Sequence, residues 1–411
     1  MNQMVKDPAK MRLEDIDVSA PELYEYDSWQ PYFKRLREEC PVHYQAESPF
    51  GPFWSVTKYD DICYVESHPE IFSSEPFITI GEFGGDIPVN AFIWTDPPLH
   101  DVQRAAVQPA VAPKNLQNFK DLIRQRTQEQ LDSLPIGEEF DWVEKVSVDL
   151  TTKMLATLFA FPLEQRSKLT YWSDIIAMSP SVGGGSVDDE ERMVGLQDCL
   201  AQFTQLWHAI EQQEPSFNLI SLLQQGEATK DMVNDPMTYL GNIALLIVGG
   251  NDTTRNSMSG SVLLMNEFPD QFEKARDNEK LIPNLVSEVV RMQTPLAHMR
   301  RTAKQDTVLN GQQIKKGDKV VMWYLSANRD EDKIENPNQF IIDRPNVRQH
   351  LSFGFGVHRC MGNRLAEMQL QILWEEIYKR FSKIEIVGEV KRTGSNFVHG
   401  YEKMPVILTA K

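Results

Sequence analysis

The chain of 411 residues is 41% hydrophobic and 25% charged, which is typical of a globular protein and excludes disordered and collagen-like chains. Its formal net charge of −17 disfavours nucleic acid and anionic membrane surfaces as partners. The four cysteines are far apart and form no CxxC pair, so they indicate neither a disulfide framework nor a zinc knuckle. Because the N-terminal segment is charged and lacks an apolar core, we expect no signal peptide or membrane anchor and a cytoplasmic location.

The first part of the chain combines a strand pattern, a long loop and a helix. Residues 53–57 (FWSVT) predict a strand, and the turn-rich stretch 72–98 predicts a loop of a length that is usually functional. Two prolines then begin a helix that places His100 and Arg104, four residues apart, on one face.

The middle of the chain is helical. Residues 179–190 (SPSVGGGSVDDE) resemble a linker but are short, which indicates a loop rather than a domain boundary. From residue 234 an apolar pattern predicts a long buried helix, whose longest uncharged stretch is shorter than the roughly 18–20 residues of a membrane span. The string VGGNDTT at 248–254 propagates a helix poorly. Either the helix ends at the two glycines, or a hydroxyl bonded back to a carbonyl bends it and opens a groove.

The last part of the chain contains two further helix patterns and one clear strand. We expect a helix leading from Pro283 to Arg291 and ending by Pro295, a strand over 319–323 (KVVMW), and an amphipathic helix over 363–381.

These patterns together predict a mainly α fold with minor β in a single domain, residues 1–411. The large helical region covers about 95–300 and 350–385, and the small β-rich region covers about 40–80 and 300–325.

A glycine-rich loop, QHLSFGFGVHRCMGNRLAE at 349–367, stands directly before the last helix and contains Cys360. Its glycines let the backbone approach a flat cofactor closely. The start of the helix directs N–H groups at the sulfur and favours the thiolate. A lone cysteine is more often a small buried hydrophobe, but this setting favours a nucleophile or a single axial metal ligand.

The order F-x-x-G-x-x-x-C-x-G resembles the haem-binding loop of cytochrome P450 monooxygenases. The resemblance implies the P450 fold and heme b, with the Cys360 thiolate as the axial ligand of the iron. It also implies that Phe353 packs beside the sulfur and that Gly362 directs its N–H toward it.

Further positions match the same family. Alone, Glu288 and Arg291 would be a weak helix-surface pair, but with Arg344 they resemble the P450 structural triad, which fixes the cysteine loop to a helix. In the VGGNDTT string, the resemblance implies that Asp252 relays protons and that Thr253 holds a water for the protonation that cleaves the O–O bond.

Thr254 is a secondary candidate for that role. The family pattern also implies that His100, Arg104, Arg301 and His358 contact the haem propionates, with Arg301 rather than its neighbour Arg300 in this register.

Four strings, beginning at Ser48, Leu246, Gln293 and His350, resemble bacterial P450s that hydroxylate the terminal methyl of medium-chain alkanes, alcohols and fatty acids. The resemblance implies a narrow apolar passage with residues 72–94 contributing a lid. The expected passage residues are Leu245, Val248, Gly249, Leu296, Ala297 and Phe397. Taken singly, such residues are more often plain core.

Three alternatives stay open: a P450 for another apolar substrate such as a monoterpene, a peroxide-driven haem-thiolate enzyme, and a haem-thiolate sensor or carrier. The Asp252–Thr253 pair argues against the peroxide-driven enzyme, because a proton relay is useful chiefly when dioxygen is split.

The expected partner is a ferredoxin, because the chain has no reductase or ferredoxin segment of its own. A flavoprotein would reduce this ferredoxin with NAD(P)H. The reduced ferredoxin would then dock near Cys360 on the enzyme, which is expected to be a monomer. Arg348, Arg359 and Arg364 could attract it, or could equally form a solvated charged face.

Overall fold

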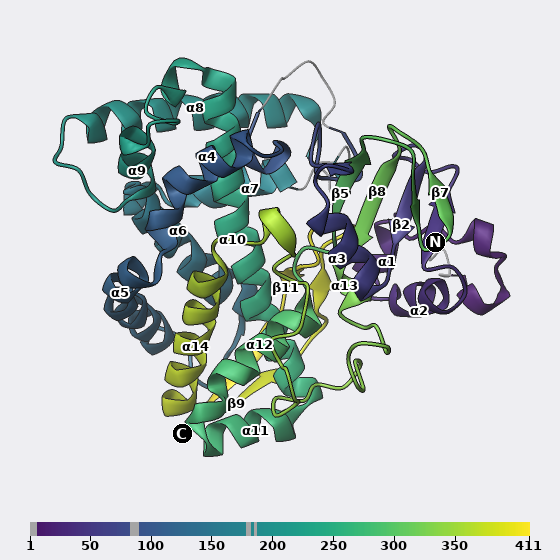
Figure 1. Cartoon of the computed structure of the whole chain (residues 1–411). Coiled ribbons are helices and arrows are strands. Elements are labelled where there is room, and N and C mark those ends of the chain that lie inside the picture. The colour runs from purple at the N-terminus through teal and green to yellow at the C-terminus, as the bar shows by residue number, and fades with distance from the viewer. Residues whose placement is uncertain (1–5, 83–89, 178–181, 185–186) are drawn as a thin grey trace.

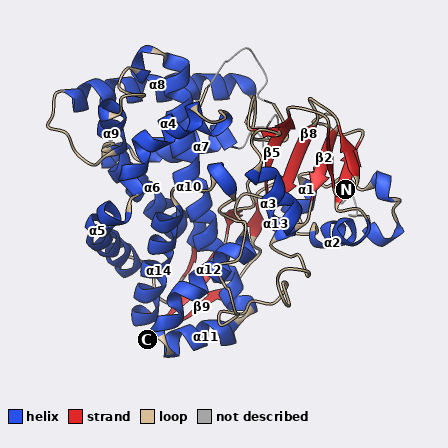
Figure 2. Ribbon diagram, viewed as in Figure 1, coloured by secondary structure: helices blue, strands red, loops and turns tan. Residues whose placement is uncertain are grey.

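The computed structural model describes residues 6–82, 90–177, 182–184 and 187–411. It is 53% helical with 13% strand, which confirms a mainly α fold with minor β (Figure 2). The helices are α1 (Glu22–Glu25), α2 (Gln30–Glu39), α3 (Tyr59–Ser67), α4 (Leu99–Val107), α5 (Pro113–Asp132), α6 (Asp149–Phe159), α7 (Ser167–Ala177), α8 (Asp189–Glu211), α9 (Leu219–Gln225), α10 (Pro236–Glu267), α11 (Pro269–Asp277), α12 (Ile282–Gln293), α13 (Tyr324–Ala327) and α14 (Asn363–Arg380). The strands are β1 (Val42–Gln45), β2 (Phe53–Val56), β3 (Phe72–Ser73), β4 (Glu139–Asp141), β5 (His298–Ala303), β6 (Thr307–Leu309), β7 (Gln312–Ile314), β8 (Lys319–Trp323), β9 (Phe381–Ile386), β10 (Lys391–Arg392), β11 (Tyr401–Lys403) and β12 (Pro405–Ala410).

Five strands form the largest sheet, in the order β1-β2-β8-β5-β3. They come from residues 42–73 and 298–323, inside or next to the two segments expected to be β-rich. β2 and β8 pair in parallel, with Trp54 opposite Val320, and the other pairs are antiparallel. Every residue of β2 and the last four of β8 are buried, and these residues are apolar except Ser55, whose hydroxyl accepts from the Trp323 ring N–H at 3.0 Å. The sheet lies on the right of Figure 1, away from α5, α6, α8 and α9.

Three smaller sheets have the orders β4-β12-β9, β6-β7 and β10-β11; β6-β7 lies within the segment 300–325 expected to be β-rich, whereas the sequence patterns missed the other two. β9 was missed because its only buried residues are Phe381 and Ile384, which breaks the strict alternation of a half-buried strand. Phe381 is already the first residue of β9, so α14 ends at Arg380, one residue earlier than expected.

The long helix α10 passes through the middle of the molecule and packs against α6, α7, α12 and α14 (Figure 1). It begins at Pro236, where the Asp235 side chain caps it by accepting a hydrogen bond from the Thr238 N–H. The helix continues to Glu267, so the interpretation that it ends at Gly249 and Gly250 is wrong.

Among the described helices, none combines the length and the apolarity needed to cross a membrane. The two loops expected over residues 72–98 and 179–190 are described in part. Residues 83–89 of the first and residues 179–181 and 185–186 of the second lie outside the described residues.

Candidate active site

The cysteine loop runs from residue 351 to the start of α14. The Cys360 N–H donates to the Phe353 carbonyl at 2.8 Å, which closes the loop on itself. Gly356 has φ +62°, and a Cβ there would lie 2.1 Å from the Glu66 carbonyl oxygen, so only glycine fits. Gly362 caps α14, and a Cβ built on it would lie 3.9 Å from the Cys360 Sγ.

The surroundings of Cys360 act on its pKa in opposite directions. Burial raises the pKa of the thiol, while the N–H groups of Gly362 and Asn363 and the guanidinium groups of Arg104 and Arg359 lower it. The helix start therefore acts on the sulfur as the sequence predicts, but burial outweighs it and the net pKa is raised. A metal ion at the sulfur would reverse this balance, because coordination deprotonates a thiol.

A cavity separates the cysteine loop from α10, and Phe353, Cys360 and Gly362 line its loop side. The remaining wall includes most of the expected passage residues: Leu245, Val248, Gly249, Leu296 and Phe397. A Cβ added to Gly249 would meet no atom within 4 Å, so this glycine opens onto free space. Ala297 is the exception, since it is fully buried in the core beneath the largest sheet and its N–H donates to the Phe397 carbonyl at 2.8 Å.

Thr253 and Thr254 also line this cavity, one turn of α10 after Gly249. The Thr253 hydroxyl donates to the Gly249 carbonyl at 3.0 Å. This is the back-bond that the sequence suggested, and it occurs within a continuous helix.

Asp252 is fully buried, and its nearest charged neighbour is Arg255 on the same helix. The Arg255 Nη2 lies 2.9 Å from the Asp252 Oδ1 and 2.7 Å from the Asp174 Oδ1 on α7. Burial raises the pKa of Asp252 to about 6, with Asp174 adding to the rise and Arg255 and the Ser173 hydroxyl opposing it. Asp174 could not be expected from the sequence because α7 and α10 are far apart along the chain, whereas Arg255 stands only three residues after Asp252 and its spacing was a local signal.

The four residues expected to contact the haem propionates lie close together. The rings of His100 and His358 are 4.2 Å apart, and Arg104, Arg301 and His358 line the cavity. Burial lowers the pKa of both histidines, so the arginines supply the positive charge. Arg300 pairs instead with Glu82 at 3.0 Å, so of these two neighbouring arginines it is Arg301 that lines the cavity.

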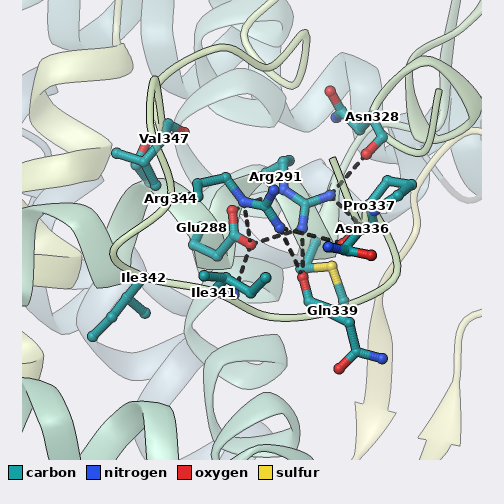
Figure 3. A network of polar contacts seen from close by, with 12 residues as sticks. Glu288, Arg291, Asn328, Asn336, Pro337, Gln339, Ile341, Ile342, Arg344 and Val347 are labelled. Atoms are coloured by element: carbon teal, nitrogen blue, oxygen red, sulfur yellow. Dashed lines mark hydrogen bonds and ion pairs between the residues drawn. The ribbon is translucent and has the colours of Figure 1, made fainter. Parts of the chain in front are cut away.

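Glu288, Arg291 and Arg344 form one buried network (Figure 3). Arg291 makes two hydrogen bonds of 2.8 Å to the Glu288 carboxylate, and the Arg344 Nε donates to it at 3.1 Å. Burial raises the pKa of Glu288, but the Arg291 guanidinium, helped by the Ile341 N–H and Arg344, lowers it below its usual value overall.

Asn328 links this network to the cysteine loop. Its carbonyl accepts from Arg291 at 2.8 Å, its side-chain oxygen accepts from the Leu351 N–H at 2.7 Å, and its amide donates to the Ser352 hydroxyl at 2.8 Å.

The cysteine loop also contacts Glu66, a residue that no motif in the sequence indicated. Its carboxylate accepts from the Phe355 N–H and the Tyr324 hydroxyl, and it pairs with Arg301 at 3.5 Å. One signal could have found it: Glu66 stands four residues after Ile62, at a core-facing position of an amphipathic helix.

The residues around the cavity fit a haem. A sulfur lies on one wall and a glycine that opens onto free space lies on the other. The buried Arg301 and the half-buried Arg104 line the cavity, and the Nε2 of the buried His100 has no hydrogen-bond partner among the described residues. A soft thiolate, apolar walls and donors for two carboxylates are the set that a thiolate-ligated haem requires.

Comparison with known proteins identifies the family. The cytochrome P450 family model matches residues 194–396. Cytochrome P450-153 from Novosphingobium aromaticivorans shares 46% identity, with a TM-score of 0.89, 96% of this chain and 99% of that chain covered. CYP153D17 from Sphingomonas sp. PAMC 26605 shares 47%, with a TM-score of 0.91, 97% of this chain and 100% of that chain covered.

Curated relatives agree with the structures. Linalool 8-monooxygenase of Pseudomonas putida is 34% identical over 97% of this chain and 100% of its own length. Methyl-branched lipid omega-hydroxylase of Mycobacterium bovis is 28% identical over 97% of this chain and 96% of its own length.

The chain belongs to the cytochrome P450 family. It is a bacterial P450 monooxygenase, an oxidoreductase, and its relatives include omega-hydroxylases.

Proposed function

We propose that this P450 hydroxylates the terminal carbon of a medium- or long-chain alkane, alcohol or fatty acid. The observation that carries the proposal is the apolar wall of Leu245, Val248, Leu296 and Phe397 in the same cavity as Cys360. A terminal C–H bond is the strongest along an alkyl chain, so selectivity for it requires a passage that presents only the chain end. The relative named as a methyl-branched lipid omega-hydroxylase supports this reaction.

A monoterpene is the second candidate substrate class. It is favoured by the relative named as a linalool 8-monooxygenase, which shares more identity with this chain than the lipid omega-hydroxylase does. A branched terpene and a linear chain both suit apolar walls, so the comparison of products decides between them.

In this proposal Cys360 holds the iron of heme b, Gly362 directs an N–H at the sulfur, and Phe353 packs beside it. Arg104 and Arg301 bind the propionates, and His100 and His358 complete their hydrogen bonds. A bound haem supplies the activation of dioxygen and the oxidation of the C–H bond. Glu288, Arg291 and Arg344 hold the loop in place through Asn328 and take no part in the chemistry.

Protons would reach the cavity along α10. Asp174 is 41% exposed at its side chain, Arg255 links it to the buried Asp252, and Thr253 follows Asp252 on the cavity side. The raised pKa of Asp252, about 6, suits a carboxyl that must both take up and release protons near neutral pH. The Thr253 hydroxyl can hold a water or pass a proton where it faces the cavity.

Electrons would come from a small acidic ferredoxin, reduced by an NAD(P)H-dependent flavoprotein, docking beside the cysteine loop. Arg359 and Arg364 are exposed there. Arg348 contributes less than expected, because its guanidinium pairs with Glu367 at 2.6 Å.

A reconstituted assay tests the proposal. The purified enzyme is supplied with ferredoxin, reductase, NADH and isotopically labelled dioxygen, and offered alkanes, fatty acids and linalool in parallel. We expect one labelled oxygen atom at the terminal carbon of the linear chains. Faster oxidation of linalool would favour the terpene reading, and full activity with hydrogen peroxide alone would overturn the dioxygen-dependent reaction.

A further inference from the structure

Glu66 lies in an environment that disfavours an acidic side chain. It belongs to the last turn of α3, where the negative end of the helix repels a carboxylate, and its side chain is 2% exposed. Burial accordingly raises its pKa. The packing of α3 needs no acid at this position, since its neighbours Ile62 and Val65 are apolar and fully buried.

The groups around Glu66 compensate for this cost, because all of them are donors. The Phe355 N–H, the Tyr324 hydroxyl and the Arg301 guanidinium all point at its two oxygens. An ionised carboxylate only accepts hydrogen bonds, so the three donors match its two oxygens.

Glu66 contacts the cysteine loop through its side chain and its backbone. A Cβ on Gly354 would lie 3.5 Å from the Glu66 Oε2, and a Cβ on Gly356 would clash with the Glu66 carbonyl oxygen. Between these glycines, the Phe355 N–H is bound by the carboxylate. The same turn contains the Phe353 carbonyl, which receives the Cys360 N–H at 2.8 Å.

The loop is therefore held at two points. Asn328 holds Leu351 and Ser352 on the side of the Glu288 network, and Glu66 holds Phe355 on the opposite side. We propose that Glu66 is a positioning residue for the cysteine ligand, because its carboxylate fixes the turn that sets the position of Cys360, and that Tyr324 and Arg301 hold this carboxylate in place. The inference rests on the proposed role of Cys360 as the haem ligand.

Two substitutions of similar size separate the hydrogen bond from the packing. Glu66→Gln keeps an oxygen that accepts from the Phe355 N–H, whereas Glu66→Met fills the same space and accepts nothing. Glu70→Met is the control, because Glu70 is exposed three residues after the end of α3. Tyr324→Phe removes one of the donors that orient the carboxylate and leaves the loop sequence unchanged.

Two measurements on the holoenzyme read out the position of the loop. The first is the rate at which the reduced carbon monoxide complex loses the red-shifted band of thiolate-bound iron in mild denaturant. The second is hydrogen exchange of the Phe355 amide. We expect Glu66→Met to lose the band at least about tenfold faster than the unsubstituted enzyme and to exchange the Phe355 amide faster. The rate of band loss in Glu66→Gln should stay within about twofold of the unsubstituted enzyme, and the rate in Tyr324→Phe should lie between those of the two Glu66 variants.

Several results would overturn the inference. One is a Glu66→Met enzyme that behaves like the Glu70→Met control, and another is equal acceleration in the Met and Gln variants. If Glu66→Met does not fold, unchanged band stability in Tyr324→Phe would count against the inference. An unsubstituted enzyme without the thiolate band would overturn both the haem assignment and this inference, whereas unexpected products would overturn only the proposed substrate.

Discussion

Asp252 and Asp174 share one guanidinium: the Arg255 Nη2 lies 2.9 Å from the first carboxylate and 2.7 Å from the second. The pair joins a fully buried acid to one that is 41% exposed at its side chain. Arg255 therefore links the buried Asp252, which is next to Thr253 in the chain, to the partly exposed Asp174.

The pKa of Asp252 should move in opposite directions when its two charged neighbours are removed. Arg255→Met removes the group that lowers the pKa and so raises it above about 6, while Asp174→Asn removes a group that raises it and so lowers it. The pKa of Asp252 in the folded protein is higher than the ordinary value of 3.8, so its protonation stabilises the fold. This stabilisation is fully present below pH 3.8 and is lost as the pH rises through about 6. Unfolding free energies measured across that pH range check both shifts. Asp252→Asn is the control, since it should abolish this pH dependence, and a pH dependence that persists in it would contradict the assignment.

Thr253→Ala should bind substrate normally but waste electrons. The substitution removes the hydroxyl that donates to the Gly249 carbonyl beside the cavity, and with it the group proposed to direct protons there. We expect a normal substrate-induced spectral change together with a rise in hydrogen peroxide formed per NADH consumed. Thr254→Ala is the comparison, and unchanged coupling of NADH to product in Thr253→Ala would remove this residue from the reaction.

Cys360→His should retain some haem and lose the thiolate signature. Imidazole can bind the iron but donates less electron density than thiolate, so the red-shifted carbon monoxide band should disappear together with hydroxylation. Cys63→Ser is the matched control, since Cys63 lies outside the cavity lining and burial holds the pKa of its thiol at about 12. A band that survives in Cys360→His would mean that another residue ligates the iron.

Glu288→Gln should be strongly destabilising. The buried Arg291 would lose its counter-charge, and an uncompensated buried charge of this kind costs about 3–5 kcal/mol. Urea unfolding measures the loss. Glu367→Gln breaks the pair with the exposed Arg348 and should cost about 1 kcal/mol or less. Equal losses in the two variants would contradict the structural role of the Glu288 network.

The parts of the fold that the sequence predicted are those that depend on local patterns. α14, β2 and β8 follow from periodicity and turn residues and lie within a residue of their expected bounds, and α4 begins directly after the two prolines as expected. The sheet of β4, β12 and β9 did not follow, because β12 also pairs with β4 from far earlier in the chain and neither β9 nor β12 alternates strictly.

A similar distinction holds for the candidate site. Cys360, Thr253 and Glu288 lie in short motifs, so their neighbourhood could be expected from the sequence. Glu66 and Asp174 reach the site only through tertiary packing of α3 and α7, and nothing within three or four residues of either one indicates its partner. Ala297 shows the opposite failure, since its neighbour Leu296 lines the cavity while the backbone turns the alanine into the core.

The open space at Gly249 has a consequence for the evolution of this enzyme. Because no protein atom lies within 4 Å of a Cβ built there, a larger residue would extend into the cavity that faces Cys360 and leave the packing of the surrounding helices unchanged. Each added carbon would take up volume between α10 and the cysteine loop, where the proposed haem and substrate both lie. A single substitution at position 249 could therefore change which substrates the enzyme accepts while its fold stays the same.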